Sequence, residues 1–244
     1  MVVAVTALVV LTAAGCAPLK GGGQRNRVML VGDSVAHSVT PELAWSFGAR
    51  GWAFEPAAQQ GCGVVRGVIA DLLGVPLFWA HACEGAIWNM HEYRVDTFRP
   101  SVVLWFGYLE EWPRHVDGGV YSPGPWAVPS AITGQPADEK ILALIEEKWA
   151  QFTRYGAKVV FVTMPPPATE HAERAAHLNN NLLKRFVLEH PGSTALIDLA
   201  AMACPPTGTP PCPTVVDGIE LRPDSVHFSP AGAGWVAEHV VPHL

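Results

Sequence analysis

Three residues near the two ends of the chain have the types needed for nucleophilic catalysis by a serine. Ser34 closes the triplet Gly32-Asp33-Ser34, and Asp224 precedes His227 by three positions near the C-terminus. A serine hydroxyl is a weak nucleophile until a base removes its proton, and the base needs a partner that fixes its tautomer. Three-residue spacing on one turn can bring the Asp224 carboxylate to His227 Nδ1 and leave Nε2 facing Ser34. The pattern therefore predicts a Ser-His-Asp triad.

Each half of this pattern also has a simpler interpretation. Asp33 and Ser34 are residue types that commonly cap helices, and the chain contains ten histidines, most of which need no special role. The placement of the two motifs favours catalysis, because one directly follows the first predicted strand and the other directly precedes the last predicted helix.

The element that must position Ser34 is a short apolar run at residues 28–31. Four consecutive apolar residues are typical of a central parallel strand covered on both faces, and Gly32 ends the run where a tight turn needs no Cβ. Ser34 then lies at the carboxyl end of this strand. In open α/β sheets, ligands bind outside the carboxyl ends of the strands.

Strands alternate with helices along the rest of the chain. We expect strands at residues 28–31, 52–57, 101–106, 158–163 and 195–199. We expect helices at residues 35–50, 83–98 and 138–155, a helix carrying Leu178, Leu182 and Phe186, and a last helix to residue 240 capped by Ser229. The alternation predicts an α/β fold, a three-layer α/β/α sandwich with a flavodoxin-like parallel five-stranded sheet in the order 2-1-3-4-5. Ser34, Gly61 and the loop after Gly107 then meet at one edge.

The segment from residue 108 to 136 is rich in proline and glycine and has no sustained periodicity, so we expect a long loop. Its aromatic residues Trp112, Tyr121 and Trp126 could stack on a sugar ring or cover the core, and covering the core is the simpler interpretation.

Composition limits the class of protein. The chain has 244 residues, which is enough for one sizeable domain, and its low charged fraction of 16% with 49% hydrophobic residues indicates a globular rather than a disordered chain. A net charge of −6 and the lack of a basic run exclude the positive surface that binds nucleic acid. We expect a monomer with no cofactor and no metal.

The first residues resemble a secretory signal. Residues 1–14 carry no charged side chain, and Ala13, Ala14 and Gly15 before Cys16 resemble a lipobox, although no Lys or Arg precedes the apolar run. We therefore expect residues 1–26 to be a signal peptide or a lipoprotein anchor with its tether, and residues 27–244 to form the domain. The protein is expected to be exported to the cell envelope, with Cys16 as the candidate lipid site and membrane attachment only through this anchor.

The remaining cysteines support export, because an even number in an oxidising compartment suggests disulfides. Cys62 with Cys83 and Cys204 with Cys212 are the local pairs, while sequence alone allows three connectivities. A metal site formed by His81, Cys83 and His91 is the alternative, and no usual ligand spacing supports it.

The sequence resembles the SGNH hydrolases, also called GDSL-type esterases, from about Arg27 to the end. The first block of that family matches Gly32-Asp33-Ser34, and its last block matches Asp224-x-x-His227. Ala36 distinguishes the first block from the Gly-x-Ser-x-Gly elbow of α/β-hydrolases. The resemblance implies acyl transfer from esters through an acyl-enzyme. It also implies that Ser34 is the nucleophile and that its backbone N–H is an oxyanion donor, together with Gly61 or, as an alternative, Gly63.

One block departs from the family pattern. The third oxyanion donor is normally an asparagine in Gly-x-Asn-Asp, where this chain has Gly107-Tyr108-Leu109-Glu110. This departure, with Gly61-Cys62-Gly63 and Arg222-Pro223-Asp224, resembles SGNH domains fused to integral-membrane acyltransferases that are associated with O-acylation of cell-surface sugars. In that subgroup an acidic residue follows the glycine, and Glu110 matches it. The only role for Glu110 suggested by the sequence is to orient an arginine or backbone groups.

We therefore expect an exported serine esterase or O-acyltransferase that acts on acyl esters, with acetyl the expected group, of an envelope carbohydrate. A catalytically silent glycan-binding lipoprotein is one alternative, motivated by the missing asparagine. A lipase or thioesterase of the same fold is another, because the triad does not restrict the acyl chain.

Overall fold

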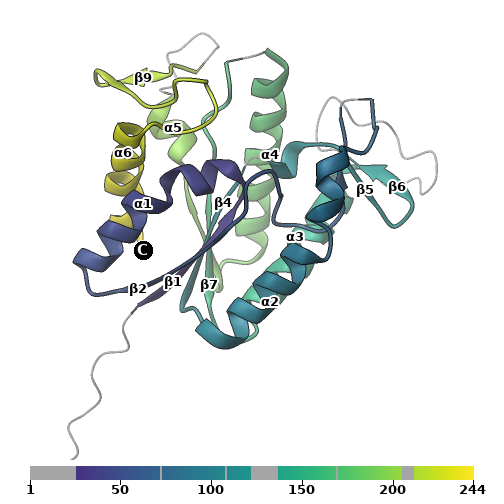
Figure 1. The fold of residues 1–244 in the computed structure, drawn as a ribbon, viewed down its shortest axis with the longest axis horizontal. Coiled ribbons are helices and arrows are strands. Elements are labelled where there is room, and N and C mark those ends of the chain that lie inside the picture. Colours follow the sequence, from purple (N-terminus) through teal and green to yellow (C-terminus); the bar gives the residue numbers. More distant parts are fainter. Residues whose placement is uncertain (1–25, 72, 108, 122–136, 169, 205–211) are drawn as a thin grey trace, which may run out of the picture.

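A five-stranded parallel sheet forms the centre of the protein (Figure 1). The computed structural model describes residues 26–71, 73–107, 109–121, 137–168, 170–204 and 212–244. The strand order is β2 (Ala53–Ala58), β1 (Arg27–Gly32), β4 (Val102–Phe106), β7 (Lys158–Val162) and β8 (Thr194–Ile197). Counted along the central sheet alone, this is the predicted order 2-1-3-4-5, which is confirmed.

Helices cover both faces of this sheet. Figure 1 shows α1 (Ser34–Ala49) and α6 (Pro230–Val240) on one side of the sheet and α2 (Ala86–Phe98) and α3 (Ala137–Thr153) on the other. The long helix α4 (Glu170–Glu189) packs with α3 in the second layer, and the short helix α5 (Leu199–Ala203) belongs to the first. The predicted three-layer sandwich is confirmed.

Strand β1 shows why residues 28–31 are all apolar. Val28 and Leu30 belong to the apolar cluster under α1 and α6, whereas Met29 and Val31 belong to the cluster under α2, α3 and α4. Side chains alternate between the two faces of a strand, so a strand with both faces covered needs apolar residues throughout. All four side chains are fully buried.

The prediction of a loop throughout residues 108–136 is wrong for residues 109–121. This part contains the 3-10 turn η2 (Leu109–Glu111) and the strands β5 (Arg114–Val116) and β6 (Gly119–Tyr121), which join β3 (Val68–Ile69) in a small antiparallel sheet. The hairpin turn is Asp117-Gly118, with both residues at positive φ, which is the two-residue turn that matches the twist of paired strands. Strands of three residues are too short to give a visible alternation.

The aromatic residues of this segment serve the core where the structure describes them. Tyr121 is 1% exposed, and Trp112 packs partly buried against the cluster that includes Ile69 and Leu109. Trp126 lies outside the described residues.

Smaller elements complete the fold. They are the 3-10 turns η1 (Phe78–Ala82) and η3 (Val241–His243) and the hairpin of β9 (Val215–Val216) and β10 (Ile219–Glu220). The helix expected from residue 83 starts at Ala86, because η1 and Gly85, whose φ is +74°, precede it. Among the described residues, no helix combines the length and the apolar composition that crossing a membrane requires.

Both local cysteine pairs are disulfides. Cys62 is bonded to Cys83 and Cys204 to Cys212, with Cα–Cα distances of 5.5 and 5.3 Å. The alternative of a metal site at His81, Cys83 and His91 is wrong, because the Cys83 sulfur is bonded to Cys62. His91 is instead buried, with Nε2 3.0 Å from the Ala57 carbonyl, and burial lowers its pKa to about 3.

Candidate active site

Ser34 is the first residue of α1 and directly follows the β1 turn. Gly32 makes this turn possible, because a Cβ at its φ of +149° would lie 1.8 Å from the Phe106 carbonyl oxygen of β4. Asp33 is fully buried and caps the helix, accepting the Val35 N–H at 2.8 Å through Oδ1. Its Oδ2 accepts the Leu109 N–H at 2.7 Å. The start of α1 is therefore tied to the segment after β4.

Asp224, His227 and Ser34 lie in a hydrogen-bonded chain. His227 Nε2 is 2.7 Å from Ser34 Oγ, and His227 Nδ1 is 2.7 Å from Asp224 Oδ2. Asp224 Oδ1 accepts the backbone N–H groups of Val226 and His227 at 2.9 and 2.7 Å. One carboxylate oxygen thus faces the imidazole while the other is held by the backbone.

The charge of Asp224 suits this position. Partial burial alone would raise its pKa, but the hydrogen bonds from the His227 ring and from the backbone N–H groups of His227 and Val226 outweigh it and lower the pKa to about 2. The carboxylate is ionised at neutral pH and therefore accepts a hydrogen bond from His227 Nδ1–H. Nε2 is then the lone-pair nitrogen that can accept the Ser34 hydroxyl proton.

The buried side chain of Arg222 holds the segment between β10 and α6 in place. This side chain is fully buried and donates to the carbonyl oxygens of Pro165 and Ser225, both at 2.7 Å, so that it joins this segment to the one after β7. Burial lowers the pKa of Arg222 to about 10, opposed by the charge of Asp224. Ser225 adopts a φ of +66°, a conformation that costs energy for a residue with a side chain and that the surrounding bonds must hold.

Two further bonds connect this segment to helices. The Phe228 N–H donates to Ser38 Oγ on α1 at 3.2 Å, and Ser229 caps α6 by accepting the Gly232 N–H at 2.9 Å. The histidine and the serine are therefore positioned relative to each other by α1 itself.

Gly61 lies beside Ser34 in an open cleft of about 540 Å³. The cleft is lined by Ser34, His37, Ser38, Gln60, Gly61 and His227. Gly61 follows β2 with a φ of +73°, which favours glycine, and the neighbouring Gln59 N–H donates to the Gly32 carbonyl at 2.9 Å. Gly61 and Ser34 are thus held at the same edge of the sheet, as the topology predicts.

Leu109 and Glu110 occupy the last two positions of the block in which the sequence lacks an asparagine. Leu109 is buried and directs its N–H to Asp33, as described above. Glu110 is 2% exposed, and its Oε1 accepts the Val64 N–H at 2.5 Å. A Cβ on Gly63 would lie 3.1 Å from the same oxygen, so the glycine allows the carboxylate to approach the backbone. Glu110 therefore ties the segment after Gly61 to the segment after β4.

Arg114 supports the same segment from β5. It is fully buried, donates to the Leu109 carbonyl at 2.7 Å and to the Val65 carbonyl at 3.3 Å, and its pKa is lowered by burial, against the opposing effect of the Glu110 charge. The sequence suggested that Glu110 orients an arginine or backbone groups, and the Val64 bond is such a contact.

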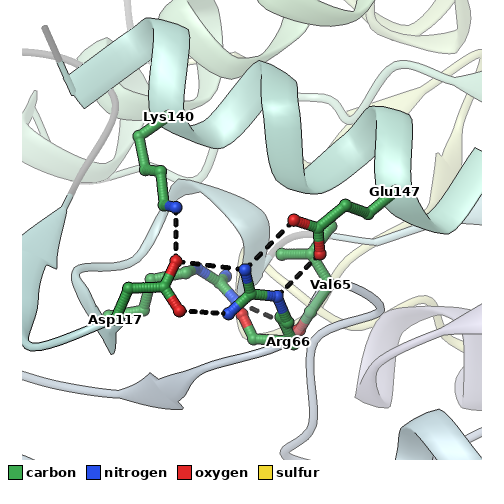
Figure 2. A network of polar contacts seen from close by, with 6 residues as sticks. Val65, Arg66, Asp117, Lys140 and Glu147 are labelled. Atoms are coloured by element: carbon green, nitrogen blue, oxygen red, sulfur yellow. Dashed lines mark hydrogen bonds and ion pairs between the residues drawn. The ribbon is translucent and has the colours of Figure 1, made fainter. Parts of the chain in front are cut away.

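An ion-pair network holds the outer end of this segment. Figure 2 shows the Arg66 guanidinium between Asp117 of the β5–β6 turn and Glu147 of α3, at 2.8 and 2.6 Å, with Lys140 also bonded to Asp117 at 2.5 Å. Hydrogen bonds to Arg66 and Lys140 hold the pKa of Asp117 below its usual range. Single exposed pairs contribute little to stability, but here two carboxylates bind Arg66 and Lys140 extends the network through Asp117.

The Cys62–Cys83 disulfide gives a stability prediction. Replacing both cysteines by serine is expected to lower the free energy of unfolding by about 3 kcal/mol, because the bond closes a loop with a sequence separation of 21. Urea unfolding at neutral pH measures it. The matched variant without the Cys204–Cys212 bond, whose separation is 8, should lose slightly less. Equal stability of the Cys62, Cys83 double variant and the parent would contradict the prediction.

Several residues of the site and its supports were missed by sequence reasoning. They are His37, Ser38 and Gln60, which line the cleft, and Arg114 and the buried partners of Arg222, which hold neighbouring segments. His37 lies one helical turn after Ser34, and Gln60 directly precedes Gly61. These positions were signals that could have identified the two residues.

The comparisons with known proteins agree with this arrangement. A sequence model of the family described as "SGNH domain (fused to AT3 domains)" matches residues 10–242. No curated protein sequence matches the chain.

Three solved structures illustrate the similarity of fold. A protein described as an acylhydrolase from Bacteroides fragilis has a TM-score of 0.56 at 13% identity, covering 91% of this chain and 88% of its own. A GDSL-like lipase from Bacteroides thetaiotaomicron has 0.52 at 11%, covering 89% and 87%. The periplasmic domain of a lipopolysaccharide acetyltransferase from Salmonella ser. Paratyphi A has 0.52 at 12%, covering 90% and 83%.

Proposed function

The chain belongs to the SGNH domain family described as fused to AT3 domains and is an ester hydrolase or acyltransferase; from this premise we propose that Ser34, His227 and Asp224 are its catalytic residues. The observation that supports the proposal most directly is the Ser34 Oγ to His227 Nε2 distance of 2.7 Å, with Asp224 on the other ring nitrogen. This is the geometry that a serine nucleophile and its base require.

The first half of the reaction forms an acyl-enzyme. Ser34 Oγ attacks the ester carbonyl carbon while His227 Nε2 takes the hydroxyl proton, and Asp224 stabilises the imidazolium. The tetrahedral intermediate then collapses with cleavage of the bond to the leaving alcohol, to which His227 returns the proton. In the second half, water or a sugar hydroxyl gives its proton to His227 and attacks the carbonyl carbon of the acyl-serine. The bond from this carbon to Ser34 Oγ then breaks, His227 returns the proton to Ser34 Oγ, and an acid or a new ester is released.

The negative oxygen formed in each half needs donors. We place the backbone N–H groups of Ser34 and Gly61 in this role, with Glu110 and Arg114 as positioning residues for the segment that follows Gly61. Leu109 stands where the family has its asparagine, and its N–H is directed to Asp33. The site therefore depends on the backbone donors more heavily than a site with a side-chain amide does.

The proposed substrate is an acyl ester, with acetyl the expected group, of an envelope carbohydrate. The polar residues His37, Ser38 and Gln60 that line the cleft support a hydroxylated substrate rather than a long acyl chain. Export to the envelope, with residues 1–26 as a signal or lipid anchor at Cys16, is supported by the two disulfides, because disulfides persist in oxidising compartments.

A labelling experiment tests the assignment of the nucleophile. A fluorophosphonate probe should label the native protein, and peptide mapping should place the label on Ser34, while protein unfolded in guanidinium before exposure should not react. Hydrolysis of p-nitrophenyl acetate should accompany the labelling and exceed that of the palmitate ester. Absence of both label and turnover would overturn the proposed catalytic role, and a preference for palmitate would favour a lipase.

A further inference from the structure

We propose that His37 and Gln60 form a subsite that binds the hydroxyl groups of the carbohydrate, which rests on the proposed function of the Ser34 site and specifies how its substrate is recognised. Both residues line the cleft that contains Ser34, Gly61 and His227. Both side chains are exposed, so they are accessible to a ligand.

The two side chains come from different elements and lie next to each other at the cleft. His37 lies on α1 one turn after Ser34, and Gln60 lies in the segment after β2, directly before Gly61. Gln60 Nε2 is 3.2 Å from His37 Nδ1. The bond joins the helix that carries the nucleophile to the segment that carries the oxyanion glycine, so the pair has a defined position beside the reacting ester.

The chemistry of the pair fits a hydroxyl group. If the amide donates to His37 Nδ1, the neutral ring carries its proton on Nε2, and Gln60 keeps a second N–H and its carbonyl oxygen for a ligand. If the amide is turned, Gln60 Oε1 accepts from Nδ1–H, and His37 Nε2 becomes an acceptor beside two amide donors. Donors and acceptors remain in both cases, and a sugar hydroxyl can satisfy both.

Two other roles for the pair are weaker. A long acyl chain would remove water from these polar groups without replacing their hydrogen bonds, which is unfavourable. A purely structural role is poorly supported, because an exposed hydrogen bond between two side chains stabilises a fold little. The pair does, however, lie beside Gly61, so an oxyanion role for Gln60 must be separated by experiment.

The test uses the full chain and compares the parent protein with Gln60→Ala and His37→Ala. Each protein is assayed with two substrates, p-nitrophenyl acetate and a mono-O-acetylated methyl glycoside. For the glycoside ester, kcat/KM is expected to fall about 10-fold in either variant through a higher KM. For p-nitrophenyl acetate, kcat is expected to stay within about twofold. The two effects should not add in the double variant, because each single change already breaks the pair. Gln59→Ala is the matched control, an exposed neighbouring glutamine that does not line the cleft.

The results that would contradict the proposed subsite can be distinguished from one another. A fall of about 100-fold in kcat for both substrates in Gln60→Ala would place this amide in oxyanion stabilisation and overturn the subsite. Unchanged KM for the glycoside ester in both variants, or a parent that turns over p-nitrophenyl acetate but no glycoside ester, would also overturn it. An NMR titration with the unacetylated methyl glycoside tests the subsite without catalysis. If the parent lacks turnover, a Kd that rises about 10-fold in Gln60→Ala supports the subsite although the proposed function has failed.

Discussion

Asp224→Asn is expected to lower kcat for ester hydrolysis by about 10³-fold to 10⁴-fold with little change in KM. In the parent, Asp224 Oδ1 accepts two backbone N–H groups, those of Val226 and His227. An asparagine keeps these bonds only if its oxygen takes the Oδ1 position, which turns its NH₂ group towards His227 Nδ1. The ring must then accept at Nδ1 and carry its proton on Nε2. In this tautomer the imidazole cannot remove the Ser34 proton.

Steady-state kinetics with p-nitrophenyl acetate measure this effect, and circular dichroism confirms that the variant is folded. Asp217→Asn is the matched control, because Asp217 is an exposed residue in the β9–β10 turn at a φ of +51°, which asparagine also adopts readily. The control should keep kcat within about twofold. If Asp224→Asn also retains nearly full activity, Asp224 does not orient the base and the proposed triad fails.

The sequence was informative wherever a single segment determines its own structure. Buried strands such as β1 show continuous apolar residues, and the caps Asp33 and Ser229 directly precede the helices that they begin. The order of the central strands followed from the alternation of strands and helices. Ser34, Asp224 and His227 were also singled out before the structure placed them within hydrogen-bond distance, because each motif lies beside a predicted element end.

The sequence was not informative where contacts join distant segments. The bond from Val64 to Glu110 spans 46 positions, and that from Arg222 to Pro165 spans 57. No local pattern marks such partners, since a buried arginine or glutamate has the same letter as an exposed one. The hairpin of β5 and β6 was missed for another reason, because three-residue strands are too short to show a period.

Removal of the Glu110 side chain is the second change for which we expect a large effect, because two buried groups depend on its carboxylate. The carboxylate accepts the Val64 N–H at 2.5 Å and is the negative charge that opposes the effect of burial on Arg114, which is fully buried. Without it, a buried backbone donor has no acceptor and a buried guanidinium has no compensating charge. Leaving a buried donor without an acceptor and a buried charge without a nearby opposite charge typically costs about 3–5 kcal/mol in total, a large share of the stability of an ordinary domain.

Glu110→Ala is therefore expected to lower the free energy of unfolding by about 3–5 kcal/mol and to lower kcat of the folded protein by about 10²-fold. The loss of activity follows because Val64 lies three residues after Gly61, so releasing its N–H lets the proposed oxyanion donor move. Urea unfolding gives the stability, and kinetics at a temperature well below Tm give kcat.

Glu110→Gln separates the two contributions of this side chain. Glutamine keeps an oxygen at the same reach, so the Val64 bond survives, but it removes the negative charge whose electrostatic effect favours the charged form of Arg114. We expect kcat within about 10-fold of the parent and a loss of stability of about 1–3 kcal/mol. Glu189→Ala removes an exposed carboxylate at the end of α4 whose ion pair with Arg185 is also exposed, so it should leave kcat unchanged and the stability nearly unchanged. A Glu110→Ala protein with parental kcat would show that the segment after Gly61 is positioned without this carboxylate. If Glu110→Gln instead loses as much activity as Glu110→Ala, the charge rather than the hydrogen bond positions Gly61.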